Sequence, residues 1–352
     1  GQDPLTYQWS LNTTNIIGAT SNILVVTDAS PAKAGDYRVT ITNPLGTTNS
    51  ASATLTVLTL PEGSYAASVL NANPLIYYRF SEAGATNVAF NLGSLGPANN
   101  GLYEGSITAG AGPQTPTFPN FELTNNAAVF DAITTDVKIP AINFNTNLPV
   151  GVTLAAWINR NGPQAPNAGV IFYRGTGGAN GIGVNIDVLQ YHWNNANFGF
   201  NSGLVVPNSQ WVLVALVIEP TQATLYLNDG VSLLSATNVA PHTAVAFSDN
   251  TSYIGWDPFS SARRFYGTID EPMIFGRALT PTEISALYSA ATTSAVRLQI
   301  TKSGGNVVVT WPTGTLQQSS DVTGPYSDLT GVTSPYTSVP SADKMFYRVR
   351  IP

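Results

Sequence analysis

The sequence contains no cysteine, which excludes disulfide bonds, zinc sites built on thiolates and cysteine nucleophiles. It has only two histidines, His192 and His242, and they lie far apart in the chain. Neither a zinc-protease helix nor a histidine cluster can be drawn from them. A Gly-x-Ser-x-Gly nucleophile elbow is also missing. Metalloprotease and serine-hydrolase chemistry are therefore not expected.

Charged residues make up only 10% of the chain. The 14 Lys and Arg against 20 Asp and Glu give a net charge of −6, and no basic run occurs, so nucleic acid is not expected as a partner. No uninterrupted apolar stretch reaches the roughly 18 residues that a membrane-spanning helix needs. We expect no membrane span.

Glycine (31) and proline (24) are plentiful, and Ser, Thr and Asn are frequent. These residues supply turns, while the Val, Ile, Thr and Tyr content suits pleated strands. The 352 residues are enough for two or three domains, each with its own core. The composition predicts an all-β protein, and we expect it to be secreted or at the cell surface.

Residues 1–58 show several short runs in which apolar and polar residues alternate, as in strands. This segment resembles the later part of an immunoglobulin-like sandwich. In that resemblance Trp9 is the core tryptophan of the third strand, Tyr37 is the tyrosine corner, and Val39 stands where antibody domains have a cysteine.

The first two strands of such a sandwich have no counterpart before Trp9. A sandwich without them exposes an apolar groove and unpaired sheet edges. Two explanations stay open. The strands belong to a part of the polypeptide that this sequence does not include, or a neighbouring copy donates them by strand exchange.

Residues 59–293 contain the largest predicted unit, with a short helix at 65–70 and many evenly spaced strands. Five phrases occur in order: Phe130-Asp131, Leu154-Ala-Ala-Trp157, Gln210-Trp211, Leu225-Tyr-Leu-Asn-Asp-Gly230, and Gly267-Thr-Ile-Asp-Glu271 leading to Arg277-Ala-Leu-Thr280. Together they resemble the laminin-G-like, concanavalin A-like jelly roll of bacterial exoproteins. The resemblance implies a two-sheet β-sandwich.

The last phrase of this series runs into a predicted helix at 281–288. Thr280 is its expected N-cap, Pro281 takes the first helical position and Glu283 completes a capping box. Residues 294–352 follow as a third unit, with short strands up to Phe346–Arg350. They resemble the small C-terminal β modules of modular exoproteins.

Glycosidases of this jelly-roll fold present their acids as Glu-x-Asp-x-x-Glu, and that spacing does not occur here. The nearest pair, Asp270-Glu271, is adjacent in a predicted strand, so the two side chains should point to opposite faces. The glycine-rich run 175–183 fits a hairpin loop better than a phosphate loop. We therefore expect no enzyme activity.

Aromatic and amide side chains gather in the stretch 190–198, and a second aromatic stretch with two arginines lies at 256–264. Sugars bind to aromatic faces and to amide or charged hydrogen-bonding groups, and paired arginines also suit sulfate or carboxylate. The candidate glycan-binding residues are Tyr191, His192, Trp193, Asn194, Trp256, Arg263 and Arg264. If 190–198 is a strand, Tyr191 and Trp193 share one face, and a core position is then equally open to them, as it is to Trp256.

Calcium is the cofactor that the jelly-roll resemblance implies, because hard cations take carboxylate and carbonyl oxygens. By the same resemblance, Asp131, Asp136 and Asp270 are the candidate ligands. The alternative is that Asp131 and Asp136 shape turns.

These features predict a non-catalytic extracellular protein of bacterial type that binds a polysaccharide or glycoconjugate, or mediates adhesion, through the jelly roll. One alternative is a structural subunit of an extracellular filament, completed by strands from a neighbour. Another is an accessory module of a polysaccharide-degrading enzyme. Fold analogy alone links the first of these to function.

Overall fold

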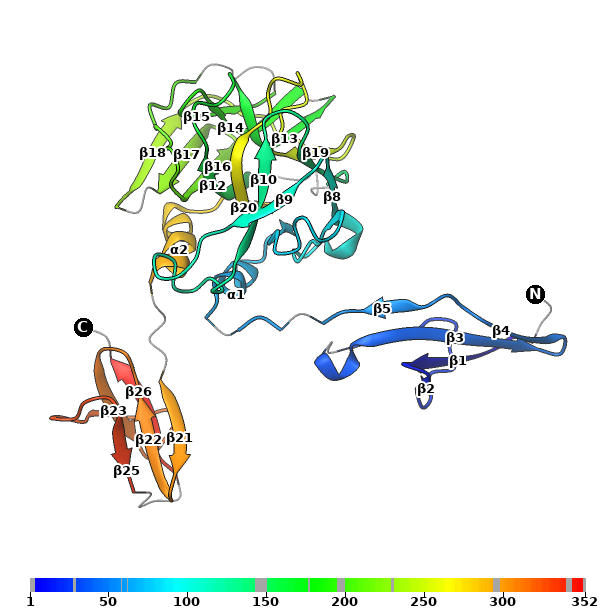
Figure 1. Cartoon of the computed structure of the whole chain (residues 1–352), viewed down its shortest axis with the longest axis vertical. Coiled ribbons are helices and arrows are strands. Elements are labelled where there is room, and N and C mark those ends of the chain that lie inside the picture. Colours follow the sequence, from blue (N-terminus) through cyan, green and yellow to red (C-terminus); the bar gives the residue numbers. More distant parts are fainter. Residues whose placement is uncertain are drawn as a thin grey trace. The chain divides into compact units, whose positions relative to one another are not determined.

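A computed structural model of the chain describes residues 4–27, 30–57, 59–61, 63–142, 151–176, 178–194, 200–228, 231–293, 298–339 and 344–350. The chain divides into two compact units, Gly1–Glu62 and Gly63–Pro352, and each is described by itself. Strands dominate both units (Figure 1), as the composition predicts.

The first unit is a single antiparallel sheet in the order β2-β1-β3-β4, with β5 also paired to β3. Its elements are β1 (Thr6–Leu11), β2 (Thr14–Asn15), the short 3-10 helix η1 (Pro31–Lys33), β3 (Gly35–Asn43), β4 (Gly46–Asn49) and β5 (Ala53–Leu55). Trp9 pairs with Val39 across β1 and β3. The Tyr37 hydroxyl donates to the Lys33 carbonyl at 2.7 Å, as a tyrosine corner requires. The immunoglobulin-like assignment of this unit stays a prediction.

Two large antiparallel sheets form the central sandwich (Figure 1). The eight-stranded sheet has the order β18-β17-β16-β12-β20-β10-β9, with β6 paired to β20. Its strands are β6 (Ile76–Tyr77), β9 (Thr108–Ala111), β10 (Asn126–Asp131), β12 (Val152–Arg160), β16 (Val212–Glu219), β17 (Gln222–Asn228), β18 (Leu233–Asn238) and β20 (Tyr266–Phe275).

The seven-stranded sheet has the order β15-β14-β13-β19-β11-β8-β7. Its strands are β7 (Val88–Ala89), β8 (Gly101–Glu104), β11 (Asp136–Ile139), β13 (Ala168–Gly175), β14 (Gly178–Asn185), β15 (Val188–His192) and β19 (Ser252–Ile254); the 3-10 helix η2 (Gly96–Asn99) precedes β8. The glycine-rich run closes the β13–β14 hairpin, where Gly175 pairs with Gly178, as expected.

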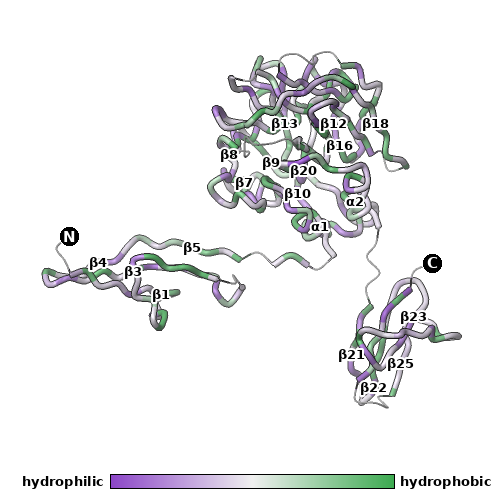
Figure 2. The backbone as a smooth tube through the Cα atoms, turned by 180° about the vertical axis from the view of Figure 1, so that it is seen from behind, coloured by the Kyte–Doolittle hydropathy of each residue, from purple (hydrophilic) through white to green (hydrophobic). Residues whose placement is uncertain are grey.

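The main core lies between the two sheets. Leu154 and Leu216 come to it from the eight-stranded sheet, and Val137 and Ile171 from the seven-stranded sheet. The strands β12 and β16 are buried on both faces, which explains their nearly continuous apolar sequences (Figure 2). Burying such side chains contributes roughly 1.5–3 kcal/mol each, so this core accounts for much of the domain's stability.

A second aromatic cluster covers the outer face of the eight-stranded sheet around Trp157. Its ring lies 5.0 Å from that of Phe118 and 5.8 Å from that of Tyr288, measured between centroids. Tyr65 belongs to α1 (Tyr65–Asn71), which Ser64 caps, and Tyr288 belongs to α2 (Pro281–Thr292). The two helices therefore help to bury this face.

The helix α2 begins as the sequence predicts. The Thr280 hydroxyl accepts from the Glu283 backbone N–H, and the Glu283 carboxylate accepts from the Thr280 N–H at 2.9 Å. Neither α1 nor α2, the α-helices of the described residues, has the length and hydropathy that a bilayer crossing requires.

The C-terminal residues form two three-stranded sheets, β21-β22-β25 and β24-β23-β26. Their strands are β21 (Gln299–Ser303), β22 (Asn306–Thr310), β23 (Thr315–Ser319), β24 (Ser327–Asp328), β25 (Tyr336–Ser338) and β26 (Phe346–Arg350). Val309, Trp311 and Leu316 are the centre of their own small core.

Candidate functional site

Two aromatic residues, one in β15 and one directly after it, lie in the core. Tyr191 and Trp193 are fully buried between the sheets. The Tyr191 hydroxyl lies 2.9 Å from His242 Nε2, and the Trp193 indole N–H donates to the Thr243 carbonyl at 2.8 Å. Their rings cannot reach a glycan in solvent, so the prediction that these two residues bind a glycan is wrong. Period-two alternation in β15 turns Tyr191 inward, and Trp193, which follows the strand, continues the same alternation.

His192 and Asn194 are also engaged within the protein. His192 points to the other face of β15, where its ring packs edge-on against Phe172 at 5.6 Å, and burial lowers its pKa to about 4. The Asn194 side chain bonds to both the backbone and the hydroxyl of Thr243. Residues 195–199 of the predicted stretch lie outside the described residues.

The second predicted stretch, by contrast, reaches the surface and centres on a buried carboxylate. Asp257 is fully buried, and its two oxygens accept from Arg174 Nε at 2.6 Å and Arg263 Nη1 at 2.7 Å. Burial raises the pKa of Asp257, but the hydrogen bonds from both arginines outweigh it and hold the pKa below its usual range. The carboxylate stays ionised and fixes both guanidinium groups.

Phe259 lies over this pair of arginines. The guanidinium carbon of Arg174 is 4.7 Å from the Phe259 ring centre, and that of Arg263 is 4.3 Å away. The ring itself is 65% exposed. This exposed ring is thus held in place by cation–π contacts with two guanidinium groups and by the bond from the Phe259 N–H to Asp257 Oδ1.

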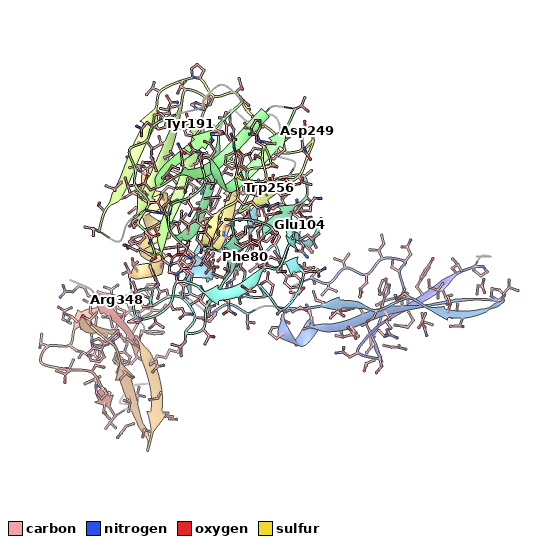
Figure 3. All side chains as sticks on the ribbon, turned by 45° about the horizontal axis from the view of Figure 1, so that its top comes forward. Phe80, Glu104, Tyr191, Asp249, Trp256 and Arg348 are labelled. Carbon is pink, nitrogen blue, oxygen red and sulfur yellow. The ribbon has the colours of Figure 1, made fainter. Side chains whose placement is uncertain are left out.

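A second aromatic–arginine pair adjoins the first. The Arg264 guanidinium lies 4.2 Å from the Trp256 ring, and it pairs with Asp136. Tyr253 packs edge-on against Trp256 with centroids 4.8 Å apart (Trp256 is labelled in Figure 3). Burial raises the pKa of Asp136, and the contact with Arg264 opposes that rise.

All of these side chains lie on the outer face of the seven-stranded sheet. Ile171 and Tyr173 of β13 belong to the core, so Arg174 points away from it, and Tyr253 alternates in the same way with Ile254 of β19. We call the set Arg174, Tyr253, Trp256, Phe259, Arg263 and Arg264 the arginine–aromatic platform. Arg174 comes to the platform from a distant strand, which the sequence alone could not show.

The acidic pair in β20 is arranged differently from the prediction. Glu271 has a φ of 52°, and the register with β12 shifts between Ala155 and Trp157, so strict alternation stops there. Both carboxyl groups are fully buried, and the charge of each helps to raise the pKa of Tyr65 in α1. The expectation that they point to opposite faces is therefore wrong, because a bulge interrupts the strand.

Each acid of this pair has its own partners. Asp270 Oδ2 accepts from Asn125 Nδ2 at 2.7 Å, and Glu271 accepts from the Tyr77 hydroxyl. Arg79 lies 3.6 Å from Glu271 but closer to Glu122, at 2.6 Å. Burial dominates at both acids: it raises the pKa of Glu271 to about 8, and it raises the pKa of Asp270 with help from the neighbouring Glu271.

The three candidate calcium ligands do not fit a calcium site. Asp131 Oδ1 accepts from the N–H groups of Ile133 and Thr134, both at 2.8 Å, which is a turn-shaping role. Asp136 forms an ion pair with Arg264, and Asp270 accepts a hydrogen bond from Asn125. Within the described ranges, no three His, Asp or Glu side chains gather closely enough to hold a metal ion.

A pocket of about 420 Å³ opens beside Trp193 and His242. Most of its lining is apolar, including Val152, Ile218 and Val245. Both His242 nitrogens have partners already, the Tyr191 hydroxyl and the Ala240 carbonyl. This pocket offers a sugar little hydrogen bonding, so the platform remains the better candidate.

One family model matches the central part of the chain. Residues 131–285 match the family model of the concanavalin A-like lectin/glucanases superfamily, of laminin-G type. No curated protein matches the chain. Among solved structures, domain 4 of AbnA, an extracellular GH43 arabinanase from Geobacillus stearothermophilus in complex with arabinotriose, is 18% identical with a TM-score of 0.44; the match covers 61% of this chain and 98% of that one.

The sialidase of Trypanosoma rangeli, in complex with 2,3-difluorosialic acid, is 15% identical with a TM-score of 0.44, and the match covers 62% of this chain and 32% of that one. The assignment rests on the family match and on the two-sheet topology around the shared core. Residues 131–285 are accordingly a laminin-G-like domain of the concanavalin A-like lectin/glucanase superfamily, within an all-β chain.

Proposed function

We propose that the protein is a non-catalytic extracellular glycan-binding protein that uses the arginine–aromatic platform. The observation that carries the proposal is the exposed Phe259 ring, which contacts Arg174 and Arg263. Sugar rings stack their C–H faces on such aromatic surfaces, and guanidinium groups donate to hydroxyl and carboxylate oxygens. A ring that is already fixed loses little conformational entropy on binding.

Charge around Phe259 favours an acidic glycan. Two guanidinium groups share the single Asp257 carboxylate, so this part of the platform has a net charge of +1 (2 − 1). The protein as a whole carries −6, so the positive charge is local. Uronate or sulfate groups would gain from it, and added salt should weaken the interaction.

The buried acids support the non-catalytic part of the proposal. Glycoside cleavage needs two carboxyl groups that reach the scissile bond from an open site. Asp270 and Glu271 have no exposed surface, and their oxygens face Asn125 and Tyr77. A substrate cannot contact these two acids, because the surrounding protein buries both of them completely.

Affinity electrophoresis of the full chain in gels containing polygalacturonate, heparin or neutral xylan tests the proposal. We expect an acidic polysaccharide to retard the protein and salt to relieve the effect. Phe259→Ala should abolish the retardation, whereas Phe90→Ala, which removes a half-exposed ring elsewhere in the domain, should leave it intact. Equal retardation of the two variants, or none for the unaltered chain in any gel, would refute the platform.

A structural role is the second candidate, and the first unit supplies the observation for it. Ile23 and Val25 are 68% and 75% exposed, and no strand of the described residues pairs with this segment. A strand added from a neighbouring copy would cover these side chains and satisfy the free backbone groups. Electron microscopy should then show filaments or oligomers that Val25→Asp disperses; single particles at every concentration would contradict this role.

A further inference from the structure

A second, smaller pocket of about 250 Å³ lies on the outer face of the eight-stranded sheet. Three of its residues stand side by side on neighbouring strands, because Thr268 of β20 pairs with both Val129 of β10 and Asn159 of β12. Their chain neighbours Ile158 and Ile269 belong to the core. Alternation therefore turns the three side chains away from the core and into the pocket.

Two connections build the rim of this pocket. Asn161 continues from β12, and its N–H donates to the Tyr266 carbonyl at 3.0 Å. Ser209 is fixed by the bond from its N–H to the Arg160 carbonyl, at 2.9 Å. The Tyr266 side chain is 42% exposed. An aromatic ring, a hydroxyl and an amide thus surround the opening.

Gly267 allows β20 and β12 to approach each other closely at the base of the pocket. Its φ is 140°, and a Cβ on it would lie 2.3 Å from the Asn159 carbonyl oxygen. Any other residue would force β20 away from β12 at this point. The pocket therefore has a backbone floor and side-chain walls.

Four polar side chains around this pocket are not used by the fold. Those of Asn159, Asn161, Tyr266 and Thr268 make no hydrogen bond to the described part of the chain. They are available to a ligand. The charged lining residue, Arg160, already donates from Nε to the Val206 carbonyl at 2.6 Å and from Nη1 to the Gly162 carbonyl at 2.9 Å.

We propose that this pocket binds one neutral sugar unit. Two carboxamides and two hydroxyls provide donors and acceptors in the mixture that a polyol requires, and the Tyr266 ring offers a face to its C–H groups. The volume is below the roughly 300–1,000 Å³ of drug-sized sites, which suits a single ring. No carboxylate of the described residues lines the pocket, so nothing there selects a cation.

This site deepens the proposed glycan-binding function and rests on it for the choice of ligand. Arg263 of the platform and Tyr266 of the pocket are three residues apart, so their Cα atoms lie within about 11 Å of each other. The platform lies on the outer face of the seven-stranded sheet and the pocket on that of the eight-stranded sheet, so the two sites are tested separately.

Saturation-transfer difference NMR on the full chain tests the pocket, with free glucose, galactose, mannose, xylose, arabinose and N-acetylglucosamine as separate probes. At least one should give protein-dependent signals. Asn159→Ala, Thr268→Val and Tyr266→Phe should each weaken binding roughly three- to tenfold, the amount expected for one lost hydrogen bond. Asn87→Ala, an exposed amide elsewhere in the domain, should leave binding unchanged. Melting temperatures verify that every variant is folded.

Signals that all three pocket variants leave unchanged would overturn the assignment, as would the absence of signals for every sugar. The two proposals can fail separately. If Phe259→Ala abolishes polysaccharide retardation but no free sugar binds, the pocket is refuted and the platform stands. If a sugar binds in the pocket while no polysaccharide is retarded, the platform is refuted and the pocket stands.

Discussion

The backbone N–H of Glu271 donates a hydrogen bond to the carboxylate of Asp270 at 2.9 Å, and neither side chain has any exposed surface. This contact between consecutive residues accompanies the positive φ of Glu271. Two acids are thereby held in one buried environment, with Tyr77 and Asn125 as neutral partners. Such an arrangement is stable when at least one acid keeps its proton.

Stability should therefore fall as pH rises toward the alkaline side of neutrality. The pKa of Glu271 is raised to about 8 in the folded chain, so the folded state binds more protons than the unfolded state above the usual glutamate range. The stabilisation is complete below about pH 4.5 and is lost as pH rises through about 8. One such group changes the free energy of unfolding by at most about 1.4 kcal/mol per pH unit. Glu271→Gln, which keeps a partner for Tyr77, should flatten the profile of melting temperature between about pH 5 and 8.

Glu283 provides the matched control for this titration. Hydrogen bonds from Arg277 and from the N-cap Thr280 lower its pKa to about 2, so its contribution is present above the usual glutamate range and is lost in acid. Glu283→Gln should leave the slope between about pH 5 and 8 unchanged. Parallel profiles for the unaltered chain and Glu271→Gln would show that Glu271 is not the titrating group.

The sandwich could be predicted because local patterns and tertiary packing agree in its central strands. The apolar runs of β12 and β16 need burial on both faces, and Thr280 with Glu283 marks a helix start without help from the fold. The bulge at Glu271 could not be predicted, because its positive φ is imposed by the register between β12 and β20. Local sequence therefore predicts regular strands better than their interruptions.

The candidate site could be predicted in part, for the same reason. Trp256, Arg263 and Arg264 lie near one another in the sequence, and the structure brings them into one surface cluster. Tyr191 has the residue type of a sugar site, but its strand register turns it inward. The pocket around Asn159 and its neighbours depends on pairing between distant strands, which composition and spacing do not reveal.

Truncating core and surface aromatics should have opposite effects on stability and binding. Trp193→Ala should cost about 3–5 kcal/mol in the free energy of unfolding, because it empties a fully buried site and removes the bond to Thr243. Phe259→Ala should change it by about 0.5 kcal/mol or less, since its ring is mostly exposed. Urea denaturation followed by tryptophan fluorescence and circular dichroism measures both. Similar losses for the two variants would place Phe259 in the core instead of on a binding surface.

Chelation should leave the protein unchanged. Asp131, Asp136 and Asp270 already accept hydrogen bonds or pair with an arginine, so no calcium is needed to balance them. We expect the same melting temperature with EDTA and with added calcium. Asp131→Ala should instead destabilise the domain by about 1 kcal/mol, as the loss of a capping side chain does, whether or not calcium is present. A melting temperature that falls in EDTA and recovers with calcium would contradict this.

Gly255 should be essential for the geometry of the platform, because it precedes Trp256 and has a φ of 82°. A Cβ at this position would lie 2.2 Å from the Phe130 ring, which is fully buried. Gly255→Ala must therefore bear both backbone strain of about 1 kcal/mol and the displacement of a core ring. Gly203→Ala isolates the first of these costs, since Gly203 has a φ of 68° and open space around its missing Cβ. We expect Gly255→Ala to be the more destabilising by about 1–3 kcal/mol in urea denaturation and to weaken polysaccharide retardation; equal costs for the two substitutions would show that Phe130 does not constrain the start of the platform.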